Sequence, residues 1–169
     1  MTSEKIVLID SKDRVMGAEE KLKVHEKGIM HRAFSIIILN SRGEMLIQRR
    51  AIDKYHSGGL WSNACCSHQR ENEILEQAIH RRLKEEMGFD CSLKEIFHFK
   101  YKTRFNNHLI ENEIDHVFIG LFDGNPIINK KEVLDFMWIP LSSLKNKIKT
   151  NPEKYSYWFK IIINKFQRL

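Results

Sequence analysis

Cysteine is scarce in this chain. Three cysteines occur among its 169 residues. Two of them, Cys65 and Cys66, are adjacent, and an odd number cannot all be paired, so the sequence has no disulfide framework of the kind that stabilises small secreted domains. We therefore expect a protein of a reducing compartment, namely the cytoplasm.

Long hydrophobic runs are missing as well. A membrane-spanning helix needs about 20 mostly apolar residues, and no stretch of this chain approaches that length. The first ten residues carry Glu4 and Lys5 beside a short apolar patch, which does not resemble a secretory signal. With 42% hydrophobic and 30% charged residues, the composition is typical of a soluble folded protein. We predict no association with a membrane.

The basic residues do not form one continuous arm. The formal net charge of +6 at pH 7 favours an anionic partner, but it does not distinguish nucleic acid from a phosphorylated metabolite. Because lysine and arginine are spread along the chain, the sequence favours the metabolite. We expect a small-molecule substrate, no nucleic acid, and a monomer or weak homodimer.

The chain shows the strand and helix patterns of one domain, with no linker or repeat, so we predict a single domain over residues 1–169. Apolar, β-rich patterns predict strands at residues 6–10, 14–18, 33–39, 45–48, 96–104, 114–122 and 136–139. A turn at Asn40–Gly43 predicts a hairpin over residues 33–50. Helices are predicted before Gly88 and over residues 141–148 and 152–166. The pattern is that of an α/β domain with a mixed sheet.

The stretch from Trp61 to Gly88 concentrates reactive side chains. A predicted loop holds Cys65, Cys66 and His68, and the helix after it carries Arg81, Arg82, Glu85 and Glu86. On a helical wheel, Arg82 and Glu86 fall inside the apolar arc, where charges are costly unless they are paired or bind a ligand. The two side chains could pair with each other, but the order with the basic residue first is the weaker one on a helix. We favour a metal and phosphate site.

Histidine and glutamate supply candidate ligands for a metal ion. The candidates are the imidazoles of His25, His31 and His68 and the carboxylates of Glu111 and Glu113. The two glutamates share one strand face, since alternate residues of a strand point the same way. Nitrogen plus carboxylate ligation suits Mn²⁺, Zn²⁺ or Fe²⁺. Competing candidates are His98, His108 and His116, the last of which points to the sheet face opposite the glutamates.

Four short strings carry a family resemblance: His31–Ser35 (HRAFS), Gln48–Arg50 (QRR), Ser62–His68 (SNACCSH) and Glu111–Glu113 (ENE). Together they resemble the type I isopentenyl-diphosphate isomerases, a family of the Nudix superfamily, over nearly the whole chain. The resemblance implies a Nudix-like α/β/α sandwich with a mixed sheet, of the α/β (α+β) class. It also implies an enzyme of isoprenoid biosynthesis that interconverts isopentenyl and dimethylallyl diphosphate.

The helix before Gly88 departs from the Nudix hydrolase pattern at one position. It keeps the hydrolase spacing at Glu73, Arg81, Glu85 and Glu86, but Arg82 stands where a hydrolase needs a glutamate. This exchange removes a ligand for the hydrolytic ions and adds a guanidinium that can clamp phosphate. The diphosphate is therefore expected to be held rather than cleaved.

The resemblance implies a role for each matching position. One divalent metal, Mn²⁺, Zn²⁺ or Fe²⁺, would be held by His25, His31, His68, Glu111 and Glu113. A Mg²⁺ ion bridging to the diphosphate would be held with the help of Glu86. The diphosphate would contact Lys21, Arg50, Lys54 and Arg82. Cys66 and Glu113 would lie on opposite faces of the alkene, Tyr101 would assist, and Trp158 would line the hydrocarbon pocket.

The chemistry explains why such residues are needed. Moving a double bond requires a proton to be added at one carbon and another to be removed from its neighbour, through a tertiary carbocation. A thiolate can accept the departing proton, and the cations near Cys66 predict a lowered pKa for its thiol. An indole face such as that of Trp158 stabilises a cation by about 1–2 kcal/mol, and water must be excluded because it would trap the cation.

Other interpretations remain open from sequence alone. Cys65 and Cys66 could both be small buried hydrophobic residues, Trp158 could only anchor the C-terminal helix, and Lys21 and Lys54 could be surface charges. A Nudix hydrolase of a nucleoside diphosphate derivative is one rival function, which Arg82 argues against. A metal-stabilised RNA-binding module is another, and its binding would be sensitive to salt.

Overall fold

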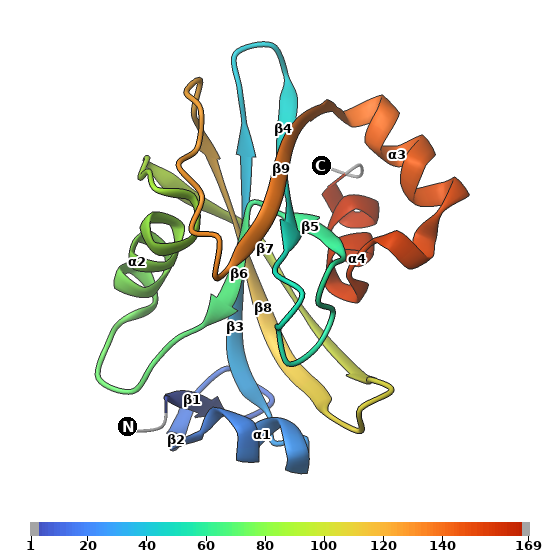
Figure 1. The fold of residues 1–169 in the computed structure, drawn as a ribbon. Helices are drawn as coiled ribbons and strands as arrows, with labels where there is room; N and C mark the ends of the chain where they lie inside the picture. Colours follow the sequence, from blue (N-terminus) through green and yellow to red (C-terminus); the bar gives the residue numbers. More distant parts are fainter. Residues whose placement is uncertain (1–3, 167–169) are drawn as a thin grey trace.

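A computed structural model describes residues 4–166 (Figure 1). Its strands are β1 (Lys5–Ile9), β2 (Val15–Glu20), β3 (His31–Leu39), β4 (Glu44–Arg50), β5 (Trp61–Asn63), β6 (Cys65–His68), β7 (Leu93–Arg104), β8 (Ile110–Leu121) and β9 (Val133–Pro140). Its helices are α1 (Lys21–Lys27), α2 (Leu75–Met87), α3 (Leu141–Thr150) and α4 (Tyr157–Phe166), with a short 3-10 helix, η1 (Pro152–Lys154), before α4. Within the described range, no helix is long and apolar enough to cross a membrane.

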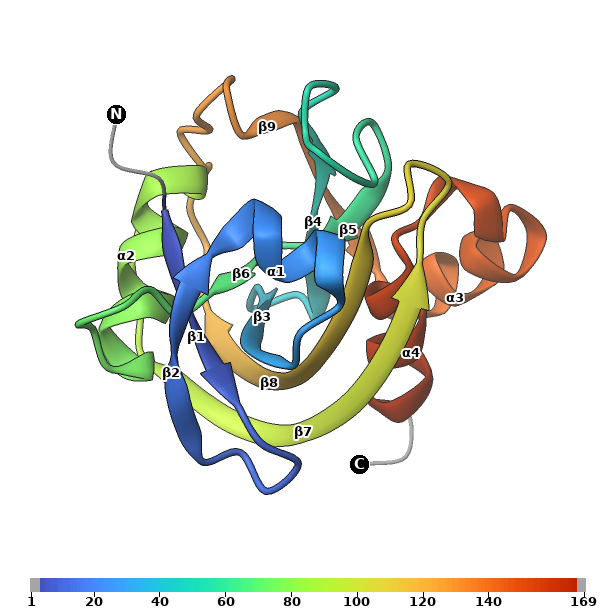
Figure 2. The same ribbon diagram turned by 90° about the horizontal axis from the view of Figure 1, so that it is seen from below.

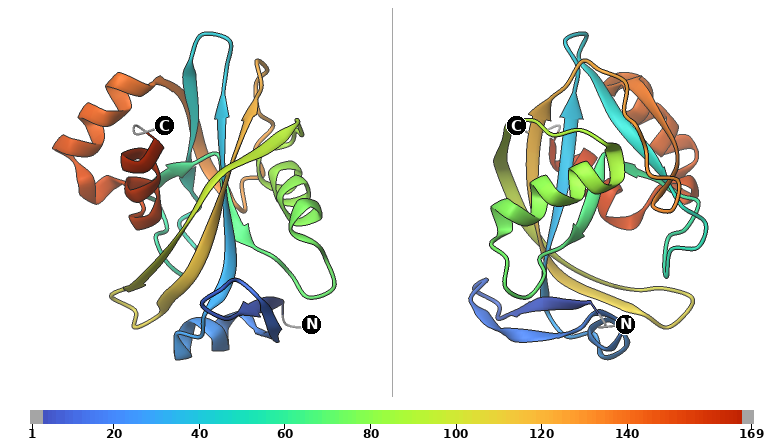
Figure 3. Two further views of the ribbon diagram at one scale, coloured as in Figure 1. Left: turned by 180° about the vertical axis from the view of Figure 1, so that it is seen from behind. Right: turned by 60° about the vertical axis from the view of Figure 1, so that its left-hand side comes forward.

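The described strands form one mixed sheet around β3. β8 runs parallel to β3 over the whole of β3, and β7 pairs with β8 in the antiparallel sense. β6 pairs with the first half of β3, whereas β4 pairs with its end at two positions and then diverges to pair with β5 and β9. The sheet is therefore split and strongly curled, with α2 on one side and α3 and α4 on the other (Figures 1 and 3). This is the predicted α/β sandwich with a mixed sheet.

Two hydrophobic cores lie on the two faces of β3. Its even-numbered residues, such as Phe34 and Ile36, pack with Leu83 of α2, while Ile37 belongs to the core that includes Phe159 of α4. Side chains of a strand alternate between faces, so the continuous apolar run of β3 reflects burial on both sides.

The N-terminal hairpin β1–β2 and helix α1 cover one end of the sheet (Figure 2). Helix α1 was not predicted, because residues 19–27 are mostly polar and its single buried apolar residue, Val24, gives no periodic stripe. The helix ends at Gly28, which has φ 62° and contributes the N–H that bonds to the Val24 carbonyl oxygen. That left-handed conformation is the usual way for a glycine to end a helix.

Most predicted strands and helices are confirmed, with shifts of a few residues at their ends. One prediction was wrong, and another is confirmed only in part. The stretch that holds Cys66 and His68 is not a loop but strand β6, because it can pair with the exposed edge of β3. The hairpin over residues 33–50 is paired only near its turn, at Ile38–Leu46 and Leu39–Met45, because the curl of the sheet separates β3 from β4 beyond those pairs.

Candidate active site

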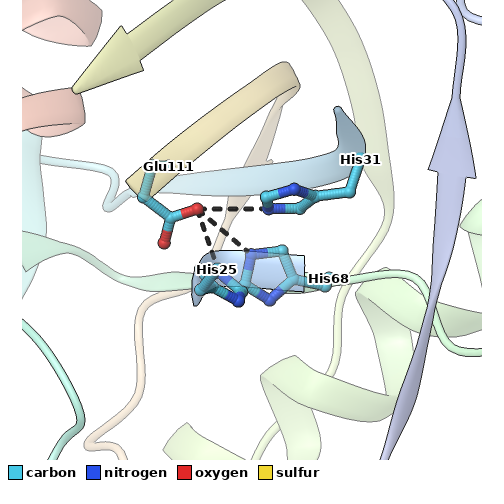
Figure 4. A group of neighbouring side chains, drawn as sticks. All are labelled: His25, His31, His68 and Glu111. Atoms are coloured by element: carbon cyan, nitrogen blue, oxygen red, sulfur yellow. Dashed lines mark hydrogen bonds and ion pairs between the residues drawn. The ribbon is translucent and has the colours of Figure 1, made fainter. Parts of the chain in front are cut away.

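Four buried side chains from four elements converge at the start of β3 (Figure 4). They are His25 of α1, His31 of β3, His68 of β6 and Glu111 of β8. The Glu111 Oε2 atom lies 3.1 Å from the Nε2 atoms of His25 and His31 and 3.9 Å from that of His68. Glu113 adds a second carboxylate, with Oε2 3.1 Å from His31 Nε2 and 3.3 Å from His68 Nε2. The predicted set of five metal ligands is thus brought together.

The hydrogen bonds of the outer ring nitrogens explain how these imidazoles are oriented. The Nδ1 atoms of His25 and His31 lie 2.6 Å from the Lys21 carbonyl oxygen and 2.9 Å from the Ile29 carbonyl oxygen. A neutral imidazole that donates through Nδ1 presents the lone pair of Nε2 on its other side. In both rings that lone pair faces the Glu111 carboxylate, so the neutral arrangement lacks a positive charge at its centre. This is the orientation that backbone carbonyls impose on metal-binding histidines.

The pKa values of the clustered side chains reflect two opposing effects, burial and the charge of the neighbouring groups. Burial alone would lower the pKa of His31, but hydrogen bonds with Glu111 and Glu113 raise the pKa to about 10. Burial would raise the pKa of Glu111, yet four histidine partners hold that pKa well below its usual value. The two carboxylates are therefore ionised, and a protonated His31 supplies one positive charge against their two negative charges. A divalent cation would supply that charge instead, and a set of three imidazoles and two carboxylates fits Mn²⁺, Zn²⁺ or Fe²⁺.

His56 is a member of this site that the sequence analysis missed. It is buried in the segment between β4 and β5, and its Nε2 atom hydrogen bonds with Glu111 Oε1, the oxygen that does not face the other three histidines. Its ring stacks on Phe105 with a centroid distance of 4.4 Å. The only sequence signal was a histidine beside Tyr55 and ahead of Gly58 and Gly59, where a turn brings the chain back toward the sheet.

A pocket opens to solvent beside the histidine cluster. Cys66, Tyr101, Glu113 and Trp158 line it, as do the basic side chains Lys21, Arg50, Lys54 and Arg82. Cys66 and Glu113 therefore line the same cavity. Ser35 pairs with Cys66 and Ala33 pairs with His68 across β3 and β6, so strand alternation turns all four toward this face.

The surroundings of Cys66 correct one prediction. Its thiol was expected to have a lowered pKa, but burial raises the pKa to about 11, and the nearby Arg50 guanidinium only partly offsets this. Arg50 Nη1 donates to the Cys66 sulfur at 3.2 Å. Because Cys66 lies on a strand and not directly before a helix, no helix terminus stabilises a thiolate there. The side chain is a protonated thiol at neutral pH.

Glu113 faces a different set of groups. The Tyr101 hydroxyl donates to its Oε1 atom. Burial and the neighbouring Glu111 both raise the pKa of Glu113, but His31 and His68 outweigh them, so its pKa is lowered. The pocket therefore contains a thiol and a carboxylate, one acid and one base.

Asp115 was also missed by the sequence analysis. It is buried, it lines the same pocket, and one oxygen accepts a hydrogen bond from Ser35 at 2.9 Å. Burial and the charge of Glu113 raise its pKa well above the ordinary value. The signal was present, because Glu111, Glu113 and Asp115 form one alternating acidic series on β8.

Each basic residue of the pocket has a partner. Lys21 Nζ lies 3.1 Å from Glu4 Oε2, and Lys54 pairs with Glu132, which also accepts from Arg82 Nη2 at 2.9 Å. None of the four predicted phosphate contacts is a freely solvated surface charge. Glu132 is a further residue that the sequence analysis missed.

The predicted alternative for α2, a pair between Arg82 and Glu86, is present in the structure. Glu86 is buried, and its second oxygen accepts a hydrogen bond from Gln48 Nε2 at 2.8 Å. Arg82 reaches past it to the pocket. Glu86 therefore contacts Arg82 from outside the pocket and does not itself line the pocket.

Trp158 contributes both to the hydrophobic core and to the pocket lining. It belongs to the first turn of α4, it is buried in the hydrophobic core, and it lines the cavity at the same time. The Arg50 guanidinium lies over its indole ring, 5.1 Å from the ring centroid. One face of this indole is thus already used by a cation.

Comparison with known proteins places this geometry in a family. Residues 29–159 match the model of the NUDIX domain. The chain is 52% identical over 161 residues to isopentenyl-diphosphate Delta-isomerase 2 of Photorhabdus laumondii, covering 95% of this chain and 91% of that protein. It is 48% identical over 155 residues to a protein of the same name from Aromatoleum aromaticum, covering 92% and 82% of the two chains.

A solved structure agrees at the level of the fold. The Deinococcus radiodurans protein DR0079 superposes with a TM-score of 0.79 at 18% sequence identity, covering 96% of this chain and 98% of its own. That identity supports the fold alone. The family is shown by the NUDIX match and by the two isomerases of high identity. This chain belongs to the isopentenyl-diphosphate Delta-isomerases of the NUDIX family.

Proposed function

We propose that this protein interconverts isopentenyl diphosphate and dimethylallyl diphosphate by adding a proton to one face of the alkene and removing another from the opposite face. The observation that carries this proposal is the pairing, in one cavity, of a protonated thiol and an ionised carboxylate. A hydrolase of the same fold would need neither group to face an alkene.

Cys66 and Glu113 are proposed as the two groups that exchange protons with the substrate. Protonation of the terminal alkene carbon forms a tertiary cation, and removal of a proton from the methylene carbon on the other side of the cationic carbon forms the isomeric alkene. One group must begin as an acid and the other as a base, and the reverse reaction exchanges their roles. Tyr101, bonded to Glu113, is proposed to hold that carboxyl group and pass it a proton.

The metal at the histidine cluster is proposed to be held by His25, His31, His68, Glu111 and Glu113. A divalent ion there increases the acidity of groups bound close to it. His25 and His31 are fixed by backbone carbonyl oxygens, and His56 is proposed to position Glu111 by holding its second oxygen. Mn²⁺, Zn²⁺ and Fe²⁺ remain the candidates for this site.

The diphosphate is proposed to bind along the basic wall formed by Lys21, Arg50, Lys54 and Arg82. Lys21, Lys54 and Arg82 would exchange contacts with their present carboxylate partners, Glu4, Glu86 and Glu132, for contacts with the phosphate oxygens. Glu86 is proposed to help hold a Mg²⁺ ion that bridges to the diphosphate. These contacts use binding energy from the diphosphate, the unreactive end of the substrate, to orient the alkene.

The hydrocarbon end is proposed to lie against Trp158. A buried indole excludes water and stabilises a carbocation without trapping it. Because Arg50 lies over the same ring, substrate binding is expected to draw this guanidinium toward the diphosphate and free the indole face.

The test is proton NMR of isopentenyl diphosphate incubated with the protein and Mg²⁺ in deuterated water. We expect signals of dimethylallyl diphosphate to appear with deuterium incorporated from the solvent. Phosphate release from a panel of nucleoside diphosphate derivatives, without turnover of isopentenyl diphosphate, would contradict the proposal and favour hydrolysis.

The compartment, domain organisation and partners of the enzyme are part of the same proposal. Cys65, Cys66 and Cys91 are all free thiols, which suits the reducing cytoplasm. A single domain over residues 1–169, a monomer or weak homodimer, and the absence of a nucleic-acid or membrane partner stay predictions.

A further inference from the structure

A second group of metal-ligating side chains lies on the sheet away from the active site. It consists of Glu95, His98 and His116. His98 and His116 are directly opposite each other on the antiparallel strands β7 and β8. His116 points to the sheet face opposite that of Glu111 and Glu113, because it is separated from them by odd numbers of strand residues. This group therefore shares no side chain with the catalytic pocket.

A β-bulge places Glu95 beside the two histidines. Residues 95 and 98 are three apart, so a regular strand would turn their side chains to opposite faces. The register of β7 shifts between Glu95 and Phe97, which inserts one extra residue on that strand. Bulges of this kind redirect a side chain, and here the result is that Glu95 reaches both rings.

The distances are those of a compact group. Glu95 Oε1 lies 2.8 Å from His116 Nδ1 and 3.6 Å from His98 Nδ1. The two imidazole centroids are 5.3 Å apart. One ligand atom from each of the three residues lies within 4.8 Å of the other two.

A second layer of contacts orients His116. Its other ring nitrogen, Nε2, lies 3.0 Å from Asp13 Oδ2 in the turn between β1 and β2. Asp13 is itself held by Arg32, whose Nε donates to Asp13 Oδ1 at 2.7 Å. A carboxylate that accepts from the outer nitrogen of a histidine fixes its tautomer, so that the inner nitrogen presents a lone pair. The inner nitrogen of His116 is the one that faces Glu95 and His98.

We propose that Glu95, His98 and His116 form a second divalent-metal site, with Asp13 as the residue that orients His116. Two imidazoles and one carboxylate are ligands that Zn²⁺ and related transition metals accept, with water in the fourth position. His98 is exposed and His116 is buried, so an ion can enter from solvent while one ligand is already held in place. The site is open and lies outside the pocket, so it is not needed for isomerisation.

The experiment is equilibrium dialysis of the full-length protein against Zn²⁺, with bound zinc counted per chain. We expect the wild type to bind one more equivalent than His98→Ala or Glu95→Gln. His108→Ala, which removes an exposed histidine from the turn between the same two strands, should bind as much as the wild type. Asp13→Asn should still bind the second zinc ion, but with an affinity about tenfold lower, since loss of a residue that orients a ligand costs 10–100-fold in metal affinity.

A second measurement locates the ion. Paramagnetic Ni²⁺ added to the protein should broaden the ring proton signals of His98 and His116 before those of His108. Equal zinc stoichiometry in the wild type and in His98→Ala, or no selective broadening, would overturn the proposal and leave only a hydrogen-bonded surface cluster. His98→Ala should keep full isomerase activity, so failure of this proposal is distinguishable from failure of the proposed function.

Discussion

Cys65 and Cys66 are chain neighbours, yet they belong to different parts of the molecule. Cys65 lies in the apolar core beneath α2, and Cys66 lies in the pocket beside Arg50 and near Asp115. Burial raises the pKa of both thiols. What differs is access to the cavity, because strand alternation turns Cys66 toward the pocket and Cys65 toward the core beneath α2.

The same division applies to the whole of β3. The face toward α2 carries large aliphatic and aromatic side chains, whereas the other face carries His31, Ala33 and Ser35 at its first half. Small residues at positions 33 and 35 leave room for the pocket. Both faces carry a hydrophobic core, but the proposed chemistry is confined to the face with the pocket. We therefore predict that substitutions in the core beneath α2 and substitutions in the pocket have separable effects.

The largest expected difference is between the two cysteines. Cys66→Ala should reduce turnover by at least about 10³-fold, since it removes a group proposed to exchange a proton with the substrate. Cys65→Ala should keep turnover and lose stability instead. The measurement is the rate of dimethylallyl diphosphate formation, with circular dichroism to confirm folding. Appreciable activity of Cys66→Ala would refute its assigned role.

Glu113→Gln sharpens the comparison on the pocket face. The amide keeps the size of the side chain but cannot accept and return a proton, so turnover should also fall by about 10³-fold or more. Lys100→Gln is the matched control, because it lies on the adjacent strand β7 and is exposed. The same assay applies, and a Glu113→Gln variant with substantial activity would contradict the proposed proton transfer.

Leu83→Ala tests the opposite face. Leu83 belongs to the inward side of α2 and is completely buried, and removal of its side chain should lower the free energy of unfolding by about 2–5 kcal/mol. The kcat of the folded fraction should be unchanged. Urea unfolding measures the first quantity, with Lys84→Ala on the exposed side of the same helix as a control. A large loss of kcat at full folding would break the separation between the two faces.

Glu86→Gln addresses the residue that links the faces, since it lies on α2 but contacts Arg82 and Gln48. We expect the Mg²⁺ concentration for half-maximal activity to rise by about tenfold, in the range found when groups around a metal are altered. Glu85→Gln, which removes a more exposed partner of Arg82, should change this Mg²⁺ concentration less. An unchanged Mg²⁺ requirement would count against the proposed role of Glu86.

The smallest expected effect is the contribution of Glu4, the carboxylate partner of Lys21, to the stability of the protein. Burial would raise the pKa of Glu4, but Lys21 and Arg70 lower it to about 2. A carboxyl group with a depressed folded-state pKa stabilises the protein above its unfolded pKa, near 4.5, and this contribution is lost as the pH falls toward 2. Because Glu4 is about one-third exposed, we expect about 1–2 kcal/mol rather than the full value.

The measurement is urea unfolding of the wild type and Glu4→Gln at pH 7 and pH 3. The variant should be less stable at pH 7, and the difference should shrink at pH 3. Glu71→Gln is the control, since its ion pair with Lys5 is solvent-exposed and has a distance of 3.7 Å. A difference between the wild type and Glu4→Gln that does not change with pH would contradict the pKa assignment.

The predictable parts of this molecule are those with a strong local pattern. The apolar run of β3, the alternation of β7 and β8 and the glycine stop after α2 all identified their elements. Gly88 has φ 75°, and a Cβ atom there would collide with the Ile127 carbonyl oxygen, so both local conformation and packing require glycine. The candidate metal ligands were named because metal chemistry restricts their residue types and because the family resemblance selected them among the eight histidines.

The missed parts depend on contacts between distant residues. β6 is a strand because the edge of β3 is available to it, and α1 is a helix because the end of the sheet covers Val24. His56 reaches Glu111 from 55 positions away in the chain. None of these contacts leaves a periodic pattern in the sequence.

By itself, the amino-acid sequence determined the strand and helix periods, the identity of the reactive groups, and which of them share a strand face, since these follow from local backbone geometry. Only the tertiary structure decided that Cys66 is a thiol rather than a thiolate, that Glu86 pairs with Arg82, and that a bulge brings Glu95 to His98 and His116. The reason is that a pKa or an ion pair depends on burial and on distances of a few ångströms, which arise only when elements remote in the chain pack together.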